Sequence, residues 1–219
     1  MSYHGGYAIE GAFPARALLC HFQKGNIPLD GIKVDGEFAP DQVHGAAFSP
    51  DGKLLALGGR VARGPTGLIR LLDTATGKLH STFTFPPGQV DALAYTPDGK
   101  LLIAVGGAPA DRYNRSDGPS KIVFWDTVTG QVWPEFETKE RVRAFALSPD
   151  GRLFATGGDG EAVILWDKAA SKQLALLQGH TPPVYALSFS PDGTKLAYTC
   201  GEKAIYLWDL TKTAEGKGR

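Results

Sequence analysis

Few residues of this chain have the types and spacing that chemistry requires. The five histidines lack zinc-type spacing and are His4, His21, His44, His80 and His180. The two cysteines, Cys20 and Cys200, stand alone 180 residues apart, so we predict no metal site, no cofactor and no disulfide framework. The sequence contains no G-x-S-x-G motif, which leaves a serine nucleophile without support. These features favour a protein that is not an enzyme.

Two loops imitate ligand-binding motifs but depart from them at the decisive residues. Residues 59–64 (GRVARG) have the spacing of a phosphate-binding loop, but Pro65 stands where its lysine is required. A later loop contains Asp111, Asn114 and Asp117, whose i, i+3, i+6 spacing does not match the alternating ligands of a calcium loop. We assign no phosphate to the first loop, and the second is at most a weak cation site.

A recurring phrase contains four further candidate carboxylates. It occurs as FSPDGKLLALGG (48–59), YTPDGKLLIAVGG (95–107), LSPDGRLFATGG (147–158) and FSPDGTKLAYTCG (189–201). Its aspartates, separated by 47, 52 and 42 residues, are Asp51, Asp98, Asp150 and Asp192. In a Pro-Asp-Gly turn, Pro presets φ, the carboxylate accepts backbone N–H groups and Gly takes a positive φ. We therefore interpret these aspartates as turn residues rather than catalytic carboxylates.

Two further elements accompany each copy and indicate strands. A β-branched and aromatic run follows each copy and ends at Asp73, Asp126, Asp167 or Asp209. A V-x-A/G-x-A/S pattern, which has the period of two of a strand, precedes each copy and begins at Val43, Val90, Val142 or Val184. An outer strand is expected after the third one, as at 78–85 and 131–136. Since 28 Gly and 15 Pro can supply tight turns, four antiparallel strands per repeat predict an all-β fold of propeller blades.

The chain resembles the WD-repeat β-propeller family, in its bacterial form with SPDG hairpins. The resemblance covers about residues 32–210 and rests on Gly179-His180 and on the pairs Trp125-Asp126, Trp166-Asp167 and Trp208-Asp209. It implies a WD-type β-propeller with four four-stranded antiparallel blades in this chain, and structural roles for the three tryptophans. Blade one departs from the pattern with Leu72-Asp73. The nearest match to the family's hydrogen-bond tetrad is His180, Thr199 and Trp208, with Glu202 near the aspartate position.

Three regions are expected along the chain: an irregular N-terminal segment (1–31), the blades (32–210) and a polar tail (211–219). The tail follows the third strand of repeat four, so that repeat lacks an outer strand of its own. Residues 32–38 lie at the offset where the other repeats carry an outer strand. We predict that they close the blade of 184–210, which removes an open edge.

The number of four blades does not decide how the ring of the propeller closes. Two chains could form one eight-bladed ring as a homodimer, which the frequency of closed two-fold assemblies favours. Residues 1–31 could instead add strands to a five-bladed or irregular ring, with Ala15–Phe22 as a candidate. The four blades could also close as a tight four-bladed ring, or belong to a fragment of a longer propeller.

The net charge of the chain and the length of its apolar segments limit which partners it can bind and in which compartment it is expected. Lys plus Arg and Asp plus Glu both number 23, and a formal net charge of zero argues against a general nucleic-acid or anionic-membrane binder. No run approaches 18 apolar residues and the start lacks a secretory pattern, so we expect neither a bilayer span nor secretion. With only two lone cysteines, the chain is expected to be a reduced, cytoplasmic protein.

The repeats differ most in the loop between their second and third strands, which lengthens to residues 58–67 in blade one and 106–121 in blade two. The resemblance implies that these loops share one rim with the loops that join blades. The residues expected to bind a partner at this rim are Arg60, Arg63, Arg112, Tyr113, Arg115, Lys121, Arg141 and His180. Arg and Tyr are enriched in interface hot spots, so we predict a docking patch for a protein or an acidic peptide. The competing interpretation is solvated loop charge.

The observations favour a non-catalytic β-propeller scaffold that mediates protein–protein interactions through its loop-rich top face. The resemblance implies this role, because WD-type propellers overwhelmingly serve as binding platforms. A competing hypothesis is a small-molecule-binding or enzyme-like propeller with a central-channel site. It would need convergent His and carboxylate groups, which the small and apolar strands at Val90 and Val142 do not offer. The chain could also be a fragment of a longer propeller with no separate role.

Overall fold

The computed structural model describes most of the repeat region. The described residues are 18–19, 32–33, 42–60, 66–86, 88–108, 118–133, 135–168, 172–201 and 204–214. They form four antiparallel sheets, one for each repeat, and a separate two-stranded pair. Their only helix is a short 3-10 helix, η1 (Leu210–Ala214), and none of them forms a helix that could cross a membrane. The predicted all-β fold with four antiparallel sheets is confirmed.

The strands of each sheet are hydrogen-bonded in chain order. The first sheet contains β3 (Gln42–Phe48), β4 (Leu54–Arg60), β5 (Gly67–Asp73) and β6 (Leu79–Phe85). The second contains β7 (Gln89–Tyr95), β8 (Leu101–Gly107), β9 (Ser120–Asp126) and β10 (Phe136–Glu137). The third contains β11 (Val142–Leu147), β12 (Leu153–Gly158), β13 (Ala162–Asp167) and β14 (Lys172–Gln178). The described strands of the fourth are β15 (Val184–Phe189), β16 (Lys195–Cys200) and β17 (Ile205–Asp209).

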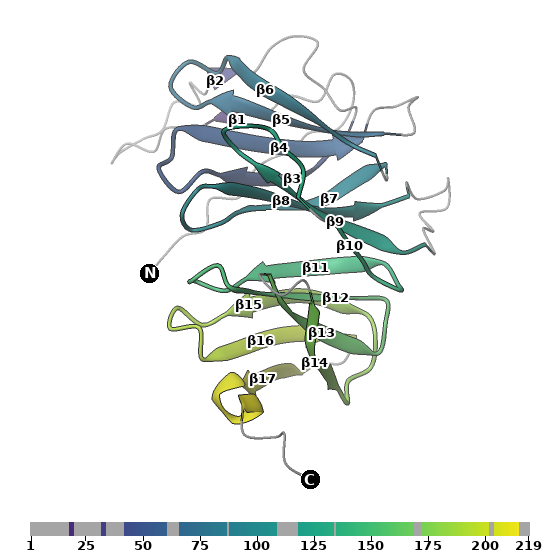
Figure 1. Cartoon of the computed structure of the whole chain (residues 1–219). Coiled ribbons are helices and arrows are strands. Elements are labelled where there is room, and N and C mark those ends of the chain that lie inside the picture. The colour runs from purple at the N-terminus through teal and green to yellow at the C-terminus, as the bar shows by residue number, and fades with distance from the viewer. Residues whose placement is uncertain are drawn as a thin grey trace, which may run out of the picture.

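The sheets stack in chain order through their inner strands. β3 lies beside β7, β7 beside β11, and β11 beside β15. Figure 1 shows the first sheet at the top of the molecule and the fourth in its lower half, so the two end sheets lie far apart. We call the side that a sheet turns toward the next sheet in the chain its forward face, and the opposite side its back face.

Each seam between sheets joins a forward face to a back face through apolar side chains. At the first seam, Ile69 and Leu71 of the forward face pack with Leu102 and Trp125 of the next back face. The corresponding residues are Ile103, Phe124, Phe154 and Trp166 at the second seam, and Val163, Leu165, Leu196 and Tyr198 at the third. Trp125 and Trp166 are buried and Trp208 packs at the third seam, which confirms the structural roles predicted for the tryptophans.

The SPDG turns are built as the sequence predicts. In the first turn, Ser49 Oγ donates to Asp51 Oδ1 at 2.7 Å, and the Lys53 N–H donates to the same oxygen at 3.1 Å. Gly52 has a φ of 71°, a left-handed conformation that glycine adopts without strain. The other three turns repeat these bonds with a Ser or Thr hydroxyl. The prediction that the recurring aspartates are turn residues is confirmed.

These turns make the stability of the fold sensitive to acid. Hydrogen bonds from the Ser190 hydroxyl and the Thr194 N–H favour the ionised carboxylate and lower the pKa of Asp192 to about 2. The pKa values of the other three turn aspartates are lowered for the same reason. Because the unfolded chain keeps the ordinary carboxyl pKa, this stabilisation is present above that pKa and is lost as the pH falls toward the folded value.

We therefore expect Asp192→Asn to lower the melting temperature at about pH 6, where the native carboxylate is ionised in both states. The difference from the wild type should shrink as the pH approaches about 2, because the wild-type carboxylate then becomes protonated as well. Thermal scans by circular dichroism across this range measure the effect, with Glu161→Gln on an exposed turn as control. A difference that stays constant with pH would contradict the assignment.

The segment predicted to close the fourth sheet pairs elsewhere in its described part. β2 (Ile32–Lys33) pairs antiparallel with β1 (Leu18–Leu19), and β17 is the outermost described strand of the fourth sheet. The β1–β2 pair joins segments that are close in sequence, so it costs less loop-closure entropy than a pairing with residues 184–210. Residues 34–38, like most of 1–31 and all of 215–219, lie outside the described residues, so the predicted region boundaries stay predictions.

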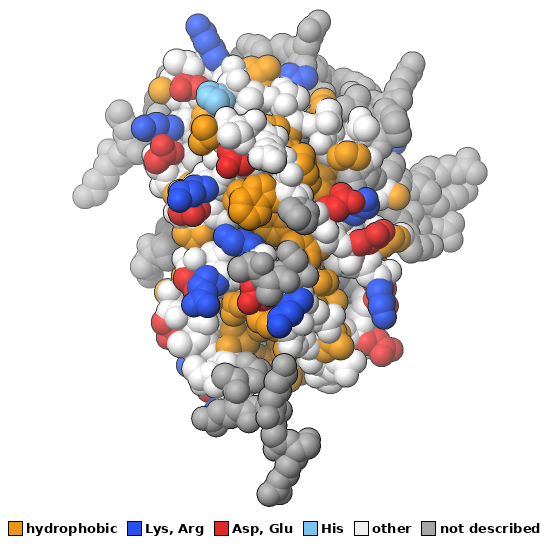
Figure 2. Space-filling view, in the orientation of Figure 1, with side chains coloured by type: hydrophobic (Ala, Val, Ile, Leu, Met, Phe, Trp, Pro, Cys, Tyr) orange, Lys and Arg blue, Asp and Glu red, His pale blue; other side chains and the backbone are white. Residues whose placement is uncertain are grey.

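The outer strands agree with the sequence in the first sheet and differ in the second. β6 reproduces the expected strand at 78–85, whereas β10 contains two residues and Val132 forms only an isolated bridge with Trp125. Pro134, which lacks an N–H, interrupts the segment between them in the sequence. Val132 and Trp133 are half exposed. Figure 2 shows hydrophobic side chains gathered in the middle of the molecule, where Figure 1 places β9 and β10.

Candidate functional site

The same irregularity occurs near the start of every inner strand. In each sheet the pairing of the inner strand with its neighbour shifts by one residue at the second position of the V-x-A/G pattern, which marks a β-bulge. The bulge residues, one in each repeat, are His44, Asp91, Arg143 and Tyr185. A bulge takes its extra residue out of the ladder and re-aims the side chain, and bulges are frequent beside active sites. We call these four residues the bulge row.

The bulge row follows the inner strands from sheet to sheet. Because β3, β7, β11 and β15 lie side by side, equivalent positions on them are neighbours. Burial lowers the pKa of His44, and the charge of Asp91 opposes that shift. Hydrogen bonding to Asp159 raises the pKa of Arg143, with smaller contributions from Tyr185 and Asp91. Four different polar side chains, an imidazole, a carboxylate, a guanidinium and a phenol, thus occupy one position of the repeat.

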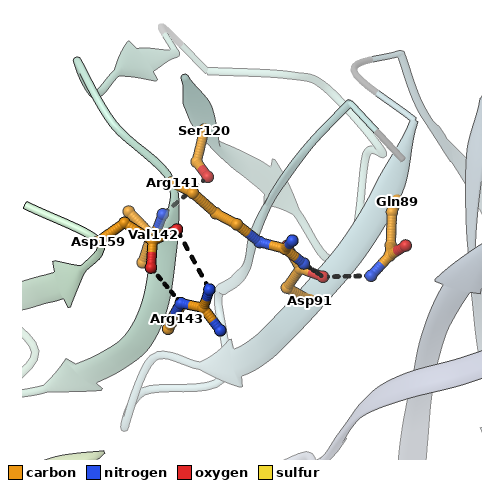
Figure 3. A network of polar contacts seen from close by, with 7 residues as sticks. All are labelled: Gln89, Asp91, Ser120, Arg141, Val142, Arg143 and Asp159. Atoms are coloured by element: carbon orange, nitrogen blue, oxygen red, sulfur yellow. Dashed lines mark hydrogen bonds and ion pairs between the residues drawn. The ribbon is translucent and has the colours of Figure 1, made fainter. Parts of the chain in front are cut away.

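Asp91 is the most buried charge of the bulge row and binds two side chains (Figure 3). Gln89 Nε2 donates to Asp91 Oδ1 at 2.6 Å, and Arg141 Nη2 lies 3.5 Å from the same oxygen. The side chains of Arg141 and Asp91 are only 15% and 18% exposed. Burial raises the pKa of Asp91, while Arg141 and Gln89 oppose the shift. This pair ties the second sheet to the segment that enters the third.

Arg143 is held by Asp159 in a two-point contact. Its Nε donates to Asp159 Oδ1, and its Nη2 lies 3.3 Å from Oδ2, the fork geometry in which guanidinium binds carboxylate (Figure 3). The hydrogen bonds to Asp159 are the main reason that the pKa of Arg143 is raised. Both side chains are about two-fifths exposed, so this guanidinium lies at the surface.

The backbone that carries Arg141 and Arg143 is fixed by buried hydroxyls. The Val142 N–H donates to Ser120 Oγ at 3.0 Å, and the Ser120 N–H donates to Thr138 Oγ1 at 3.0 Å. The chain also passes close to Gly158, where an added Cβ would lie 1.9 Å from the Arg141 carbonyl oxygen. These contacts hold the two arginines in place without help from their own side chains.

His44 and Arg60 extend the charged region to the first sheet. Burial lowers the pKa of His44, Asp91 opposes this shift, and Arg141 and Arg60 add to it. We call His44, Arg60, Asp91, Arg141, Arg143, Asp159 and Tyr185 together the inner rim. The inner rim therefore draws side chains from all four sheets.

The structure brings together only part of the predicted docking patch. Arg60 and Arg141 belong to the inner rim, whereas Lys121 lies on β9 and binds Glu135 through Nζ and Oε1 at 2.5 Å. His180 is buried, with Nδ1 3.1 Å from Tyr198 Oη. Four predicted residues lie outside the described part of the chain: Arg63, Arg112, Tyr113 and Arg115.

The sequence prediction missed the bulge row itself. His44, Asp91 and Arg143 follow the first valine of each V-x-A/G pattern, and Tyr185 follows it in the fourth repeat. The signal was available: this position changes chemical type in every repeat, while the residues on both sides of it are Val and Ala or Gly. This variable position lies within the inner strands and not in the long loops between the second and third strands.

The hydrogen-bond set around His180 differs from the one the resemblance implied. Tyr198, rather than Thr199, connects the imidazole to the indole, because Trp208 Nε1 donates to Tyr198 Oη at 3.4 Å. Side chains alternate along β16, so Tyr198 lies on the back face together with Trp208. Thr199 lies on the forward face. Trp166 Nε1 makes the equivalent bond to Thr156 Oγ1 at 2.8 Å in the third sheet. Glu202 lies outside the described residues.

The inner rim has no arrangement suited to a metal ion. Within the described ranges, no three His, Cys, Asp or Glu side chains come close enough to hold one. Its chemistry is that of paired guanidinium and carboxylate groups with an exposed phenol, which suits the binding of polar protein side chains.

Comparisons with known proteins agree with the repeat architecture. Residues 131–167 and 171–209 match the family model described as WD domain, G-beta repeat. The chain is similar to the WD repeat-containing protein VIP3 of Arabidopsis thaliana, with 29% identity over 70% of this chain and 34% of that protein. It is also similar to the general transcriptional corepressor TUP1 of Saccharomyces cerevisiae, with 36% identity over 22% of this chain and 7% of that protein.

A third relative is the U3 snoRNP-associated protein-like YAOH of Oryza sativa subsp. japonica, with 30% identity over 31% of this chain and 17% of that protein. The chain thus matches 34% or less of the length of each of these relatives.

Proposed function

Because the chain carries WD40 repeats, we propose that it is a non-catalytic scaffold that binds a protein partner across the inner rim. Proteins with this repeat are typically interaction scaffolds. One observation carries the proposal: four bulges at one position of the repeat present four different polar side chains. A position with a purely structural role would be expected to keep one residue type, as the neighbouring valines do.

The chemistry of the inner rim favours an acidic segment of the partner. Its three arginines exceed its two aspartates, and Tyr185 is 57% exposed. Arg143 already binds one carboxylate in fork geometry, and a carboxylate of the partner can replace Asp159 in the same geometry. Tyr and Arg are the residues that most often dominate binding energy at interfaces.

We expect Arg143→Ala and Tyr185→Ala each to weaken binding of an acidic peptide by about tenfold or more, the loss typical of hot-spot truncation. Fluorescence anisotropy with labelled Glu-rich peptides, at low and high salt, measures the effect. Arg152→Ala is the matched control, because Arg152 is exposed at the SPDG turn at the other end of the third sheet. Equal losses for Arg152→Ala, or equal binding of Lys-rich peptides, would contradict the proposal.

The docking surface would extend beyond the inner rim along the long loops. Residues 61–65 and 109–117, with Arg63, Arg112, Tyr113 and Arg115, would form this extension. The double variant Arg112→Ala/Arg115→Ala tests it separately from the bulge row. We further propose that the chain is of the bacterial type of the WD-repeat family and that the protein is cytoplasmic.

A further inference from the structure

The forward face of the fourth sheet exposes residues whose counterparts are buried in the other three sheets. Four residues before the aspartate that ends the third strand, Ile69, Ile122 and Val163 are all 0% exposed, whereas Ile205 is 77% exposed. Two residues before that aspartate, Leu71, Phe124 and Leu165 are buried, whereas Leu207 is 64% exposed. All eight residues are large and apolar, and their surroundings differ.

Strand pairing places these two side chains together on the forward face of the fourth sheet. Leu207 lies opposite Ala197 and Ile205 opposite Thr199 on β16. Tyr206 and Trp208 alternate with them and pack against the third sheet from the back face. We call Ala186, Ala197, Ile205 and Leu207 the open face.

Polar residues surround the open face at positions where the other sheets are apolar. Lys195 stands where the first three sheets have Leu54, Leu101 and Leu153, all of which pack into seams. Ser188 likewise stands where they have alanine. An apolar centre with a polar rim is the anatomy of an interface between separate molecules rather than of a permanent core.

A head-to-tail neighbour would need a free back face on the first sheet, and that face is covered. Leu55, Leu57 and Leu72 on it are 3%, 4% and 0% exposed. The eight-bladed ring of two chains predicted from the sequence would require the open face to meet that buried surface. Among the residues that the structure describes, the exposed apolar sheet face that a second copy offers is its own open face.

We propose that two copies of this chain dock through their open faces in a two-fold symmetric contact. A two-fold contact pairs the same patch on both copies, so the open face of each copy is sufficient to form it. The zero net charge of the chain imposes no long-range repulsion between copies. The proposal is independent of the inner rim and of what the inner rim binds.

Multi-angle light scattering tests the proposal on the full 219-residue chain. We expect the wild type to approach a dimer mass with rising micromolar concentration, and Leu207→Lys to raise the apparent dissociation constant by about 100-fold or more, the scale of a hot-spot loss. Leu176→Lys is the matched control, since Leu176 is an aliphatic residue 49% exposed on β14, outside the open face. Circular dichroism confirms that each variant folds.

Crosslinking then tests the geometry. In a Cys20→Ser background, Leu207→Cys should form a disulfide between copies rapidly, because a two-fold axis brings the same residue of both copies together. Leu176→Cys should not. A wild type that stays monomeric, a dimer that survives Leu207→Lys, or equal crosslinking from position 176 would each overturn the proposal. The second of these outcomes would point to pairing along the edge of β17 instead.

Discussion

Phe154→Ala is expected to lower the free energy of unfolding by about 3–5 kcal/mol, the range for removing a buried aromatic side chain. Phe154 is fully buried at the second seam. Its ring stacks on Trp166 with centroids 5.7 Å apart and meets Phe136 edge-on at 5.4 Å. The alanine would remove these contacts and leave a cavity between two sheets.

Urea unfolding followed by tryptophan fluorescence and circular dichroism measures this loss. Phe154→Leu should cost less, because it retains most of the volume. Phe48→Ala is the matched control, since Phe48 is 43% exposed and loses fewer contacts. A loss for Phe154→Ala no larger than that of Phe48→Ala would show that the second seam does not unfold with the rest of the protein.

Gly158→Ala is expected to destabilise the fold by about 1–3 kcal/mol or more, as overpacking does in a tight interior. The new Cβ would lie 1.9 Å from the carbonyl oxygen of Arg141, which is backbone and cannot rotate away. The segment from Arg141 to Arg143 must therefore shift. That shift should also disturb the pairing of Arg141 with Asp91 and weaken peptide binding at the inner rim.

Gly118→Ala provides the control, because a Cβ there meets no atom within 4 Å and its φ is not in the left-handed region. Melting temperature and peptide affinity should both change in Gly158→Ala and stay near wild type in Gly118→Ala. If Gly158→Ala melts at a lower temperature but binds peptide normally, the close approach supports the fold and does not position the inner rim.

The repeated phrases predicted most of the fold, because their information is local. The alternation that begins at Val142 became β11, and the Pro-Asp-Gly turns formed with the expected carboxylate bonds. Strand periodicity also decides which hydroxyl meets Trp208. Since side chains on a strand alternate between faces, Tyr198 and not Thr199 shares a face with Trp208.

The inner rim could be predicted only in part. Arg60 and Arg141 were expected from loop composition, but Asp91 was not, although it lies 3.5 Å from Arg141. These two residues are 50 positions apart in the chain, and only the stacking of β7 beside β11 brings them together. No local pattern in the sequence indicates that two residues so far apart in the chain are in contact.

The sequence by itself determined the four repeat sheets and the chemistry of their turns. Only the tertiary structure decided which faces are covered. Ile69 and Ile205 are the same residue at the same position of the repeat, yet one is fully buried and the other is 77% exposed. The physical reason is that burial depends on whether another sheet packs against a face, which is a property of the assembled molecule and not of the strand.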